Sequence, residues 1–105
     1  MCGFVGIVRK GQNEEIIKKM NDRIKHRGPD GDGYYINGDV ALGHRRLSII
    51  DLAGGDQPIY NEDENIVTVY NGEIYNYREL KDELSKLGHK FKTKSDTEVL
   101  VHGYE

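Results

Sequence analysis

Apolar residues recur along the chain at both strand-like and helical spacings, which predicts a mixed α and β domain. Residues 3–9 form a short apolar run with two glycines, which is typical of a buried strand closely approached by another backbone. Residues 14–25 then carry apolar side chains at helical spacing, and Asn13 before them is suited to cap the helix. The chain therefore opens with a strand followed by an amphipathic helix.

The middle of the chain is richer in turn-forming residues. Segment 26–33 contains three glycines and a proline, so it is predicted to be a loop. Residues 34–36 and 39–43 flank the dipeptide Asn37-Gly38, which favours a tight β-hairpin turn. A hairpin is therefore expected directly after the loop.

Further strands and a helix follow. Residues 46–51 are predicted to form a strand, and Ile66–Tyr70, which is made of β-branched and aromatic residues, is predicted to form another. Asn76 and Glu79 have the spacing of a capping box, and Gly88 stands where a left-handed residue would end the helix they begin.

The C-terminal residues predict one more helix. Phe91 lies in a short extended stretch, after which Ser95 and Glu98 have the spacing of a helix start. The apolar pattern of this helix is still running at Glu105, so we expect the chain to be the N-terminal part of a longer domain. The order of elements predicts an α+β fold.

Composition narrows the class of protein. The chain has 105 residues and a net charge of -3, so it lacks the basic stripe that nucleic acid or an anionic membrane surface would require. No apolar run is long enough to span a membrane. Its one cysteine cannot form an internal disulfide, which fits the reducing cytoplasm. We therefore expect a soluble cytoplasmic protein.

Cys2 is the first candidate for chemistry. A small side chain after Met1 allows aminopeptidases to remove Met1, which would leave a thiol and a free α-amine on one residue. Since the reference pKa of an α-amine is about 7.7–8.0, that amine can serve as the general base for its own thiol. The alternative is an ordinary small apolar residue at a frayed chain end.

Three other segments offer groups that could bind a substrate. Asn71 and Gly72 could direct a side-chain amide and an N–H at one oxyanion, or form a plain type I′ turn. Of Arg45 and Arg46, strand alternation predicts that one faces a site, where it could hold a carboxylate, and one faces away; two surface ion pairs are the alternative. Asp96 could bind an ammonium group or simply cap a helix.

Metal and nucleotide sites are not predicted. The four histidines show no helical i,i+3 or i,i+4 pairing with each other, and there is no second cysteine. The glycine-rich segment 28–33 follows no predicted strand and lacks the lysine of a phosphate-binding loop.

Six blocks of sequence, taken together, resemble the N-terminal glutaminase domain of the class II glutamine amidotransferases, which are N-terminal-nucleophile hydrolases. Within that family they are most similar to the glutamine-dependent asparagine synthetases. The blocks are MCGFVGI at the start, HRGPDGDG at 26–33, LGHRRLSIIDL at 42–52, QP at 57–58, NGEIYNYREL at 71–80 and SDTEVLVHGYE at 95–105.

The resemblance implies a fold and a domain assignment. The family's fold is an αββα four-layer sandwich, in which two antiparallel sheets lie between helix layers. Residues 1–105 would be the N-terminal portion of this type-2 glutaminase domain, present without its remainder.

The resemblance also implies residue roles. Cys2 would be the nucleophile, its α-amine the base, and Asn71 and Gly72 the donors to the oxyanion. Arg46 would hold the glutamine α-carboxylate, and Arg27–Asp30 would give structural support. The α-ammonium and amide ends of glutamine would be held by the backbone of Leu47, Ser48, Ile49 and Ile50, together with Glu73 and Asp96.

The implied reaction converts glutamine to glutamate and ammonia through a thioester. In the full-length enzymes, the ammonia passes to a C-terminal synthetase domain that uses ATP and Mg²⁺ to make asparagine from aspartate, and these proteins can form homodimers. No cofactor is expected within residues 1–105. Two alternatives stay open: the glutaminase domain of another class II amidotransferase, such as those making glucosamine 6-phosphate or phosphoribosylamine, and a non-catalytic fragment.

Overall fold

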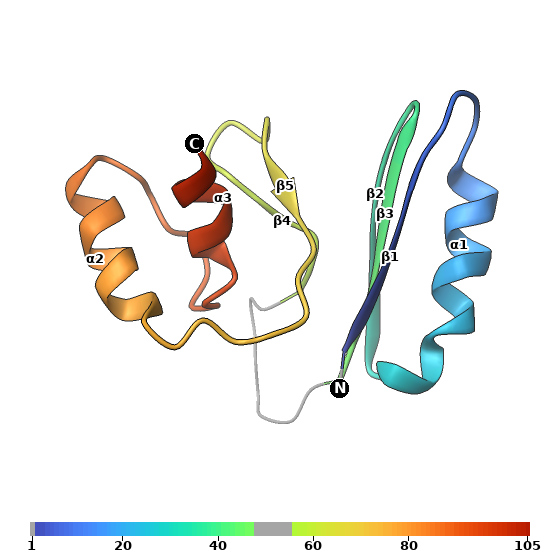
Figure 1. Cartoon of the computed structure of the whole chain (residues 1–105), viewed down its shortest axis with the longest axis horizontal. Coiled ribbons are helices and arrows are strands. Elements are labelled where there is room, and N and C mark those ends of the chain that lie inside the picture. The colour runs from blue at the N-terminus through green and yellow to red at the C-terminus, as the bar shows by residue number, and fades with distance from the viewer. Residues whose placement is uncertain (1, 48–55) are drawn as a thin grey trace.

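The computed structural model describes residues 2–47 and 56–105, which fold into two α+β halves, each with one antiparallel sheet (Figure 1). The N-terminal half holds β1 (Gly3–Val8), α1 (Glu14–Arg23), the 3-10 helix η1 (Lys25–Arg27), β2 (Gly31–Asn37) and β3 (Val40–Arg46). The C-terminal half holds β4 (Ile59–Tyr60), β5 (Val67–Thr68), α2 (Tyr77–Lys86) and α3 (Glu98–Tyr104). The predicted α+β class is confirmed, whereas the complete four-layer sandwich stays an expectation. No helix in the two described ranges is long and apolar enough to cross a bilayer.

The three-stranded sheet has β3 at its centre, with β1 and β2 antiparallel on either side. Helix α1 covers one face and buries Ile17 completely. The register pairs Gly3 with Arg45 and Phe4 with His44. Because paired residues share a face and neighbours alternate, Arg45 lies on the α1 face and His44 on the face turned toward the C-terminal half.

The predicted hairpin is present, but its turn lies one residue later than expected. Asn37 pairs with Val40, which leaves Gly38 and Asp39 as the loop, with φ of 55° at Gly38. Glycine at the first loop position suits this backbone conformation. The predicted loop 26–33 is wrong at its end, since β2 begins at Gly31 and pairs there with Arg46.

The predicted side-chain caps are wrong at the starts of α1, α2 and α3, since none of these helices has a side-chain cap hydrogen bond within the described residues. The Asn13 amide instead donates to the carbonyls of Arg9 at 3.1 Å and Gly38 at 3.2 Å, and so joins α1 to the hairpin. The last helix starts at Glu98 rather than Ser95, whose hydroxyl accepts from the N–H of Thr97 at 3.2 Å. The polar side chains of Asn13 and Ser95 therefore form tertiary and turn hydrogen bonds instead of helix caps.

Gly88 ends α2 as predicted. Its φ is 103°, and its N–H donates to Ser85 O at 3.1 Å while the N–H of His89 donates to Leu84 O at 3.1 Å. These two bonds form a Schellman motif, which fixes the direction in which the chain leaves the helix. His89 is therefore held directly beyond the helix end.

The C-terminal half has a small core of Ile59, Val99 and Val101 between β4 and α3. Strand β4 was not predicted from the sequence. Only Val67–Thr68 of the predicted strand Ile66–Tyr70 pairs, and Phe91 lies outside the strands. The predicted strand 46–51 is seen only where β3 ends at Arg46, because residues 48–51 lie outside the described part of the chain.

Candidate active site

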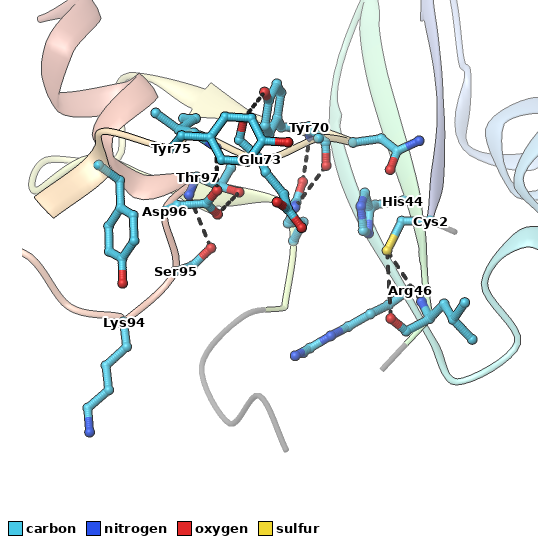
Figure 2. A pocket seen from close by; sticks show the side chains of 16 residues that line it. Cys2, His44, Arg46, Tyr70, Glu73, Tyr75, Lys94, Ser95, Asp96 and Thr97 are labelled. Carbon is cyan, nitrogen blue, oxygen red and sulfur yellow. Dashed lines mark hydrogen bonds between the residues drawn. The ribbon is translucent and has the colours of Figure 1, made fainter. Parts of the chain in front are cut away.

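A cavity of about 570 Å³ lies between the two halves (Figure 2). Cys2, His44, Arg46 and Leu47 line it from the sheet, and Gln57, Tyr70–Tyr75, Tyr77 and Lys94–Thr97 line it from the C-terminal half. Seven predicted site residues meet here: Cys2, Arg46, Leu47, Asn71, Gly72, Glu73 and Asp96. The other three, Ser48, Ile49 and Ile50, lie outside the described residues.

Cys2 directly precedes β1, and continued strand alternation puts its side chain on the same sheet face as Phe4 and His44. Its Sγ accepts a hydrogen bond from the N–H of Leu47 at 3.4 Å. Its carbonyl accepts from Nε of Arg27 at 3.2 Å. Cys2 is thus partly buried at the cavity wall, and both its thiol and its carbonyl have hydrogen-bond partners.

The two adjacent arginines point to opposite faces, as predicted from strand alternation. Arg46 lines the cavity and forms an ion pair with Asp56, whose side chain is 85% exposed. Arg45 is buried on the α1 face, donates through Nε to Gly28 O at 2.9 Å and pairs with Asp32 at 3.4 Å. Arg46 is therefore the arginine that faces a ligand in the cavity.

Gly28 shows why the turn before β2 needs a glycine. A Cβ on Gly28 would lie 2.3 Å from the carbonyl carbon of Arg45, which no side chain tolerates. The N–H of Asp30 donates to Arg46 O at 3.0 Å, so residues 28–30 run against the end of β3. This supports the predicted structural role of segment 27–30.

Asn71 and Gly72 do not form a type I′ turn, because neither residue has a positive φ. The segment leaves β5 and lines the cavity opposite the sheet. Asp96 holds it from the α3 side: its Oδ2 accepts from the N–H of Ile74 at 2.7 Å. The plain helix-cap interpretation of Asp96 is wrong, since Thr97 is the residue before α3 and Asp96 bonds to another segment.

Gln57 is a site residue to which the sequence analysis assigned no role. Its side-chain Nε2 donates to Tyr70 O at 3.0 Å, and its Oε1 accepts from the N–H of Tyr70 at 2.6 Å. A Cβ on Gly33 would lie 1.8 Å from Gln57 O, so β2 and residue 57 are in close backbone contact. Gln57 thus connects the sheet to the residue that precedes Asn71.

His44 also escaped the sequence analysis, although its i,i+2 spacing from Arg46 on one strand places both on one face. It is 2% exposed, and its Nε2 has no hydrogen-bond partner among the described residues. Burial lowers the pKa of His44 below its ordinary 6.5, the charge of Arg46 adds to this, and a hydrogen bond to the Tyr70 backbone and the charge of Asp56 oppose it. A neutral imidazole therefore lines the cavity beside Cys2.

The sequence is similar to those of known proteins along its whole length. The chain is 53% identical over 110 residues to asparagine synthetase [glutamine-hydrolyzing] 1 of Bacillus subtilis (strain 168), covering 99% of this chain and 17% of that protein. It is 46% identical over 109 residues to asparagine synthetase [glutamine-hydrolyzing] 1 of Arabidopsis thaliana, covering 100% of this chain and 18% of that protein. The chain thus spans less than a fifth of the length of these relatives. The family described as "Glutamine amidotransferase domain" matches residues 1–105. Together with the cavity around Cys2, this match establishes that the chain belongs to the glutamine amidotransferase domain family.

Proposed function

We propose that the cavity binds glutamine and that Cys2 hydrolyses its side-chain amide. The observation that carries the proposal is the convergence of Cys2, Arg46 and Asn71, from three separate segments, on one cavity. A thiol, a guanidinium and a side-chain amide are the groups needed to attack an amide, hold an α-carboxylate and stabilise an oxyanion. The names of the relatives, which describe them as glutamine-hydrolysing, support this choice of substrate.

The first step is attack by the thiol. Once Met1 has been removed, the α-amine of Cys2 accepts the thiol proton, and the sulfur attacks Cδ of glutamine. The negative charge that develops on the amide oxygen is stabilised by the Asn71 side-chain amide and the Gly72 N–H. Loss of one such donor typically lowers the rate by about 10²–10³-fold.

The second half of the reaction releases both products. The Cys2 α-ammonium returns its proton to the leaving nitrogen, so that ammonia departs and a thioester joins Sγ to the glutamyl carbonyl. Water, deprotonated by the same amine, then attacks the thioester. The tetrahedral intermediate formed by this attack then collapses, which releases glutamate and regenerates the thiol.

Binding of the α-carboxylate involves an exchange of partners at Arg46. The arginine side chain is 10% exposed, whereas that of Asp56 is 85% exposed, so the aspartate can move into solvent at little cost. A substrate carboxylate can then take its place with two parallel hydrogen bonds. Glu73 and Asp96, on the opposite wall, bring negative charge to the α-ammonium. Leu47 lines the same cavity, and the backbone of residues 48–50, outside the described part of the chain, is proposed to contact the substrate as well.

We also propose that the chain works as part of a longer protein that resembles its relatives. The ammonia would pass to a synthetase domain in which ATP and Mg²⁺ support the formation of asparagine from aspartate. Nothing in this scheme requires a cofactor bound to residues 1–105.

The test combines intact mass with a glutamate-release assay on the 105-residue chain. We expect a mass lower by one methionine, glutamate release from glutamine, and loss of that release in Cys2→Ala. An electrophilic diazoketone analogue of glutamine should add to Cys2 and should not label Cys2→Ala. A chain that is processed and folded, yet shows neither release nor labelling, would contradict the proposal.

A further inference from the structure

A second group of polar side chains lies outside the cavity, at the end of the C-terminal half. Glu62, His89, His102 and Glu105 each offer one potential ligand atom, and these atoms all lie within 4.8 Å of one another. They come from the turn after β4, from the residue beyond Gly88 and from the last turn of α3 and its end (Figure 1). None of the four lines the cavity around Cys2.

The distances between these atoms fit a coordination sphere. Nδ1 of His102 lies 2.9 Å from Oε1 of Glu62, and Nδ1 of His89 lies 3.1 Å from Oε2 of Glu62 and 3.4 Å from Oε2 of Glu105. In a tetrahedral zinc site with bonds of about 2.0–2.1 Å, neighbouring donor atoms are about 3.3–3.4 Å apart. Shifts of a few tenths of an ångström would bring these three spacings to those values, and the wider pairs, which lie within 4.8 Å, would have to close further.

The buried partner of His102 orients its ring for ligation. Nε2 of His102 lies 2.8 Å from the carboxylate of Glu98, and both side chains are 1% exposed. Glu98 also accepts from the N–H groups of Lys92 at 2.9 Å and Thr93 at 2.7 Å, so it acts as a carboxylate acceptor and places the His102 proton on Nε2. The lone pair of Nδ1 then faces Glu62, which is the carboxylate–histidine arrangement found behind metal-ligating histidines.

Two buried atoms of the cluster lack any hydrogen bond. Nδ1 of His102 and Oε1 of Glu62 are without a hydrogen-bond partner among the described residues, despite lying 2.9 Å apart. A buried histidine nitrogen and a buried carboxylate oxygen are each costly to leave unsatisfied. A cation between them would satisfy both at once.

We propose that Glu62, His89, His102 and Glu105 bind one zinc ion or a divalent transition metal of the same chemistry. Two imidazole nitrogens with two carboxylates suit zinc, whereas Mg²⁺ and Ca²⁺ prefer ligand sets made of oxygen alone. Outer contacts hold the ligands: Asn61 donates to the Glu105 carboxylate at 3.3 Å, and the Phe91 ring packs 4.4 Å from that of His102. The ion would tie the turn after β4 to the ends of α2 and α3.

This role is structural and independent of glutamine hydrolysis. The same half of the molecule carries Asp96 and Asn71 to the cavity, so a metal that joins its three segments would hold that wall in place. The competing interpretation is a doubly protonated His102 that pairs with Glu62 and Glu98 without a metal. Metal titration separates the two.

The experiment uses the 105-residue chain with Cys2→Ser, which removes the thiol as a competing ligand. After treatment with a chelator, Zn²⁺ is titrated by calorimetry, and Co²⁺ is titrated as a probe whose visible absorption reports tetrahedral coordination. We expect one equivalent to bind and to raise the Tm. His89→Gln and Glu105→Gln should each weaken binding by at least the about 10–100-fold that loss of an outer-shell partner typically costs. His26→Gln changes an exposed histidine elsewhere and should leave the affinity unchanged.

Circular dichroism of each metal-free variant checks that the fold is retained. His89 and Glu105 are chosen because their side chains are partly exposed, at 18% and 37%, so their replacement disturbs the core less than a change at His102. Absence of saturable Zn²⁺ binding by the folded Cys2→Ser chain would overturn the proposal. The proposal would also be overturned if His89→Gln and Glu105→Gln bound Zn²⁺ as tightly as the Cys2→Ser parent. It would likewise be overturned if His26→Gln lost as much affinity as they do.

Discussion

The side-chain amide of Gln57 bonds to both backbone polar groups of Tyr70, accepting from its N–H at 2.6 Å and donating to its carbonyl at 3.0 Å. The side chain thus substitutes for a neighbouring strand at the point where β5 has already ended. Because Asn71 follows directly, this pair sets where the proposed oxyanion donors begin. Support for this wall of the proposed active site therefore comes from a residue 13 positions earlier in the sequence.

Replacing Gln57 by alanine should damage both stability and activity. The change leaves the N–H and carbonyl of Tyr70 without their partner, which typically costs about 1–3 kcal/mol for a buried group. Urea unfolding should show that loss, and glutamate release should fall with it because Asn71 is no longer held. Gln12→Ala, at an exposed position, is the matched control and should change neither quantity. Unchanged glutamate release in a folded Gln57→Ala chain would contradict the role given to this pair.

Asp96 can be tested by separating its charge from its hydrogen bond. In Asp96→Asn the amide oxygen can still accept from the N–H of Ile74, so the free energy of unfolding should change by less than about 1 kcal/mol. The lost charge should raise the KM for glutamine by about 10–100-fold, the value of a hydrogen bond to a charged group. Asp96→Ala should lose stability as well. An unaltered KM in Asp96→Asn would leave Asp96 with a purely structural role.

Burial of His44 should make the free energy of unfolding depend on pH. Its pKa in the folded state is lowered, chiefly by burial, relative to 6.5 in the unfolded chain. Above 6.5 both states carry a neutral ring, so the contribution of His44 is complete. As the pH falls from there toward the folded pKa, only the unfolded chain takes up the proton, and stability decreases by up to about 1.4 kcal/mol per pH unit.

The measurement compares the free energy of unfolding of the wild-type chain and His44→Leu between about pH 5 and pH 8. The difference between the two should shift in favour of His44→Leu as the pH falls. His26→Gln, at an exposed histidine, should retain the wild-type slope. Parallel curves for wild type and His44→Leu would show that His44 does not titrate as the structure implies.

Two glycines offer a contrast in packing. Alanine at Gly33 would place Cβ 1.8 Å from Gln57 O, so the hairpin and residue 57 would have to separate. We expect a loss of at least the about 1–3 kcal/mol that overpacking typically costs. A Cβ on Gly103, within α3, would meet no described group within 4 Å apart from its chain neighbours and the backbone of its own helix, and Gly103→Ala should stabilise the chain by up to about 1 kcal/mol. Thermal or urea unfolding distinguishes the two, and a harmless Gly33→Ala would refute the close approach.

Several features of the fold could be predicted from local sequence patterns alone. The helix predicted over residues 14–25 was found over Glu14–Arg23, and this periodicity depends on neighbours along the chain. The same is true of the glycine that ends α2 and of the alternation of Arg45 and Arg46. Helix periodicity, left-handed φ and strand alternation are properties of the backbone itself. The resemblance at the motifs around Cys2 and Asn71 likewise needed only the order of residues.

The sequence by itself determined the α+β fold class and the family, and from its resemblance to that family it indicated the residues that a glutaminase is expected to use. The tertiary structure alone decided which polar side chains meet. Asn13 turned from a helix cap to the hairpin, Gln57 paired with Tyr70, and His89 came to lie beside His102. Such contacts join segments far apart along the chain, and they depend on strand register and on how the two halves pack. No local pattern carries that information, because the burial that makes a polar group seek a partner exists only once the chain has folded.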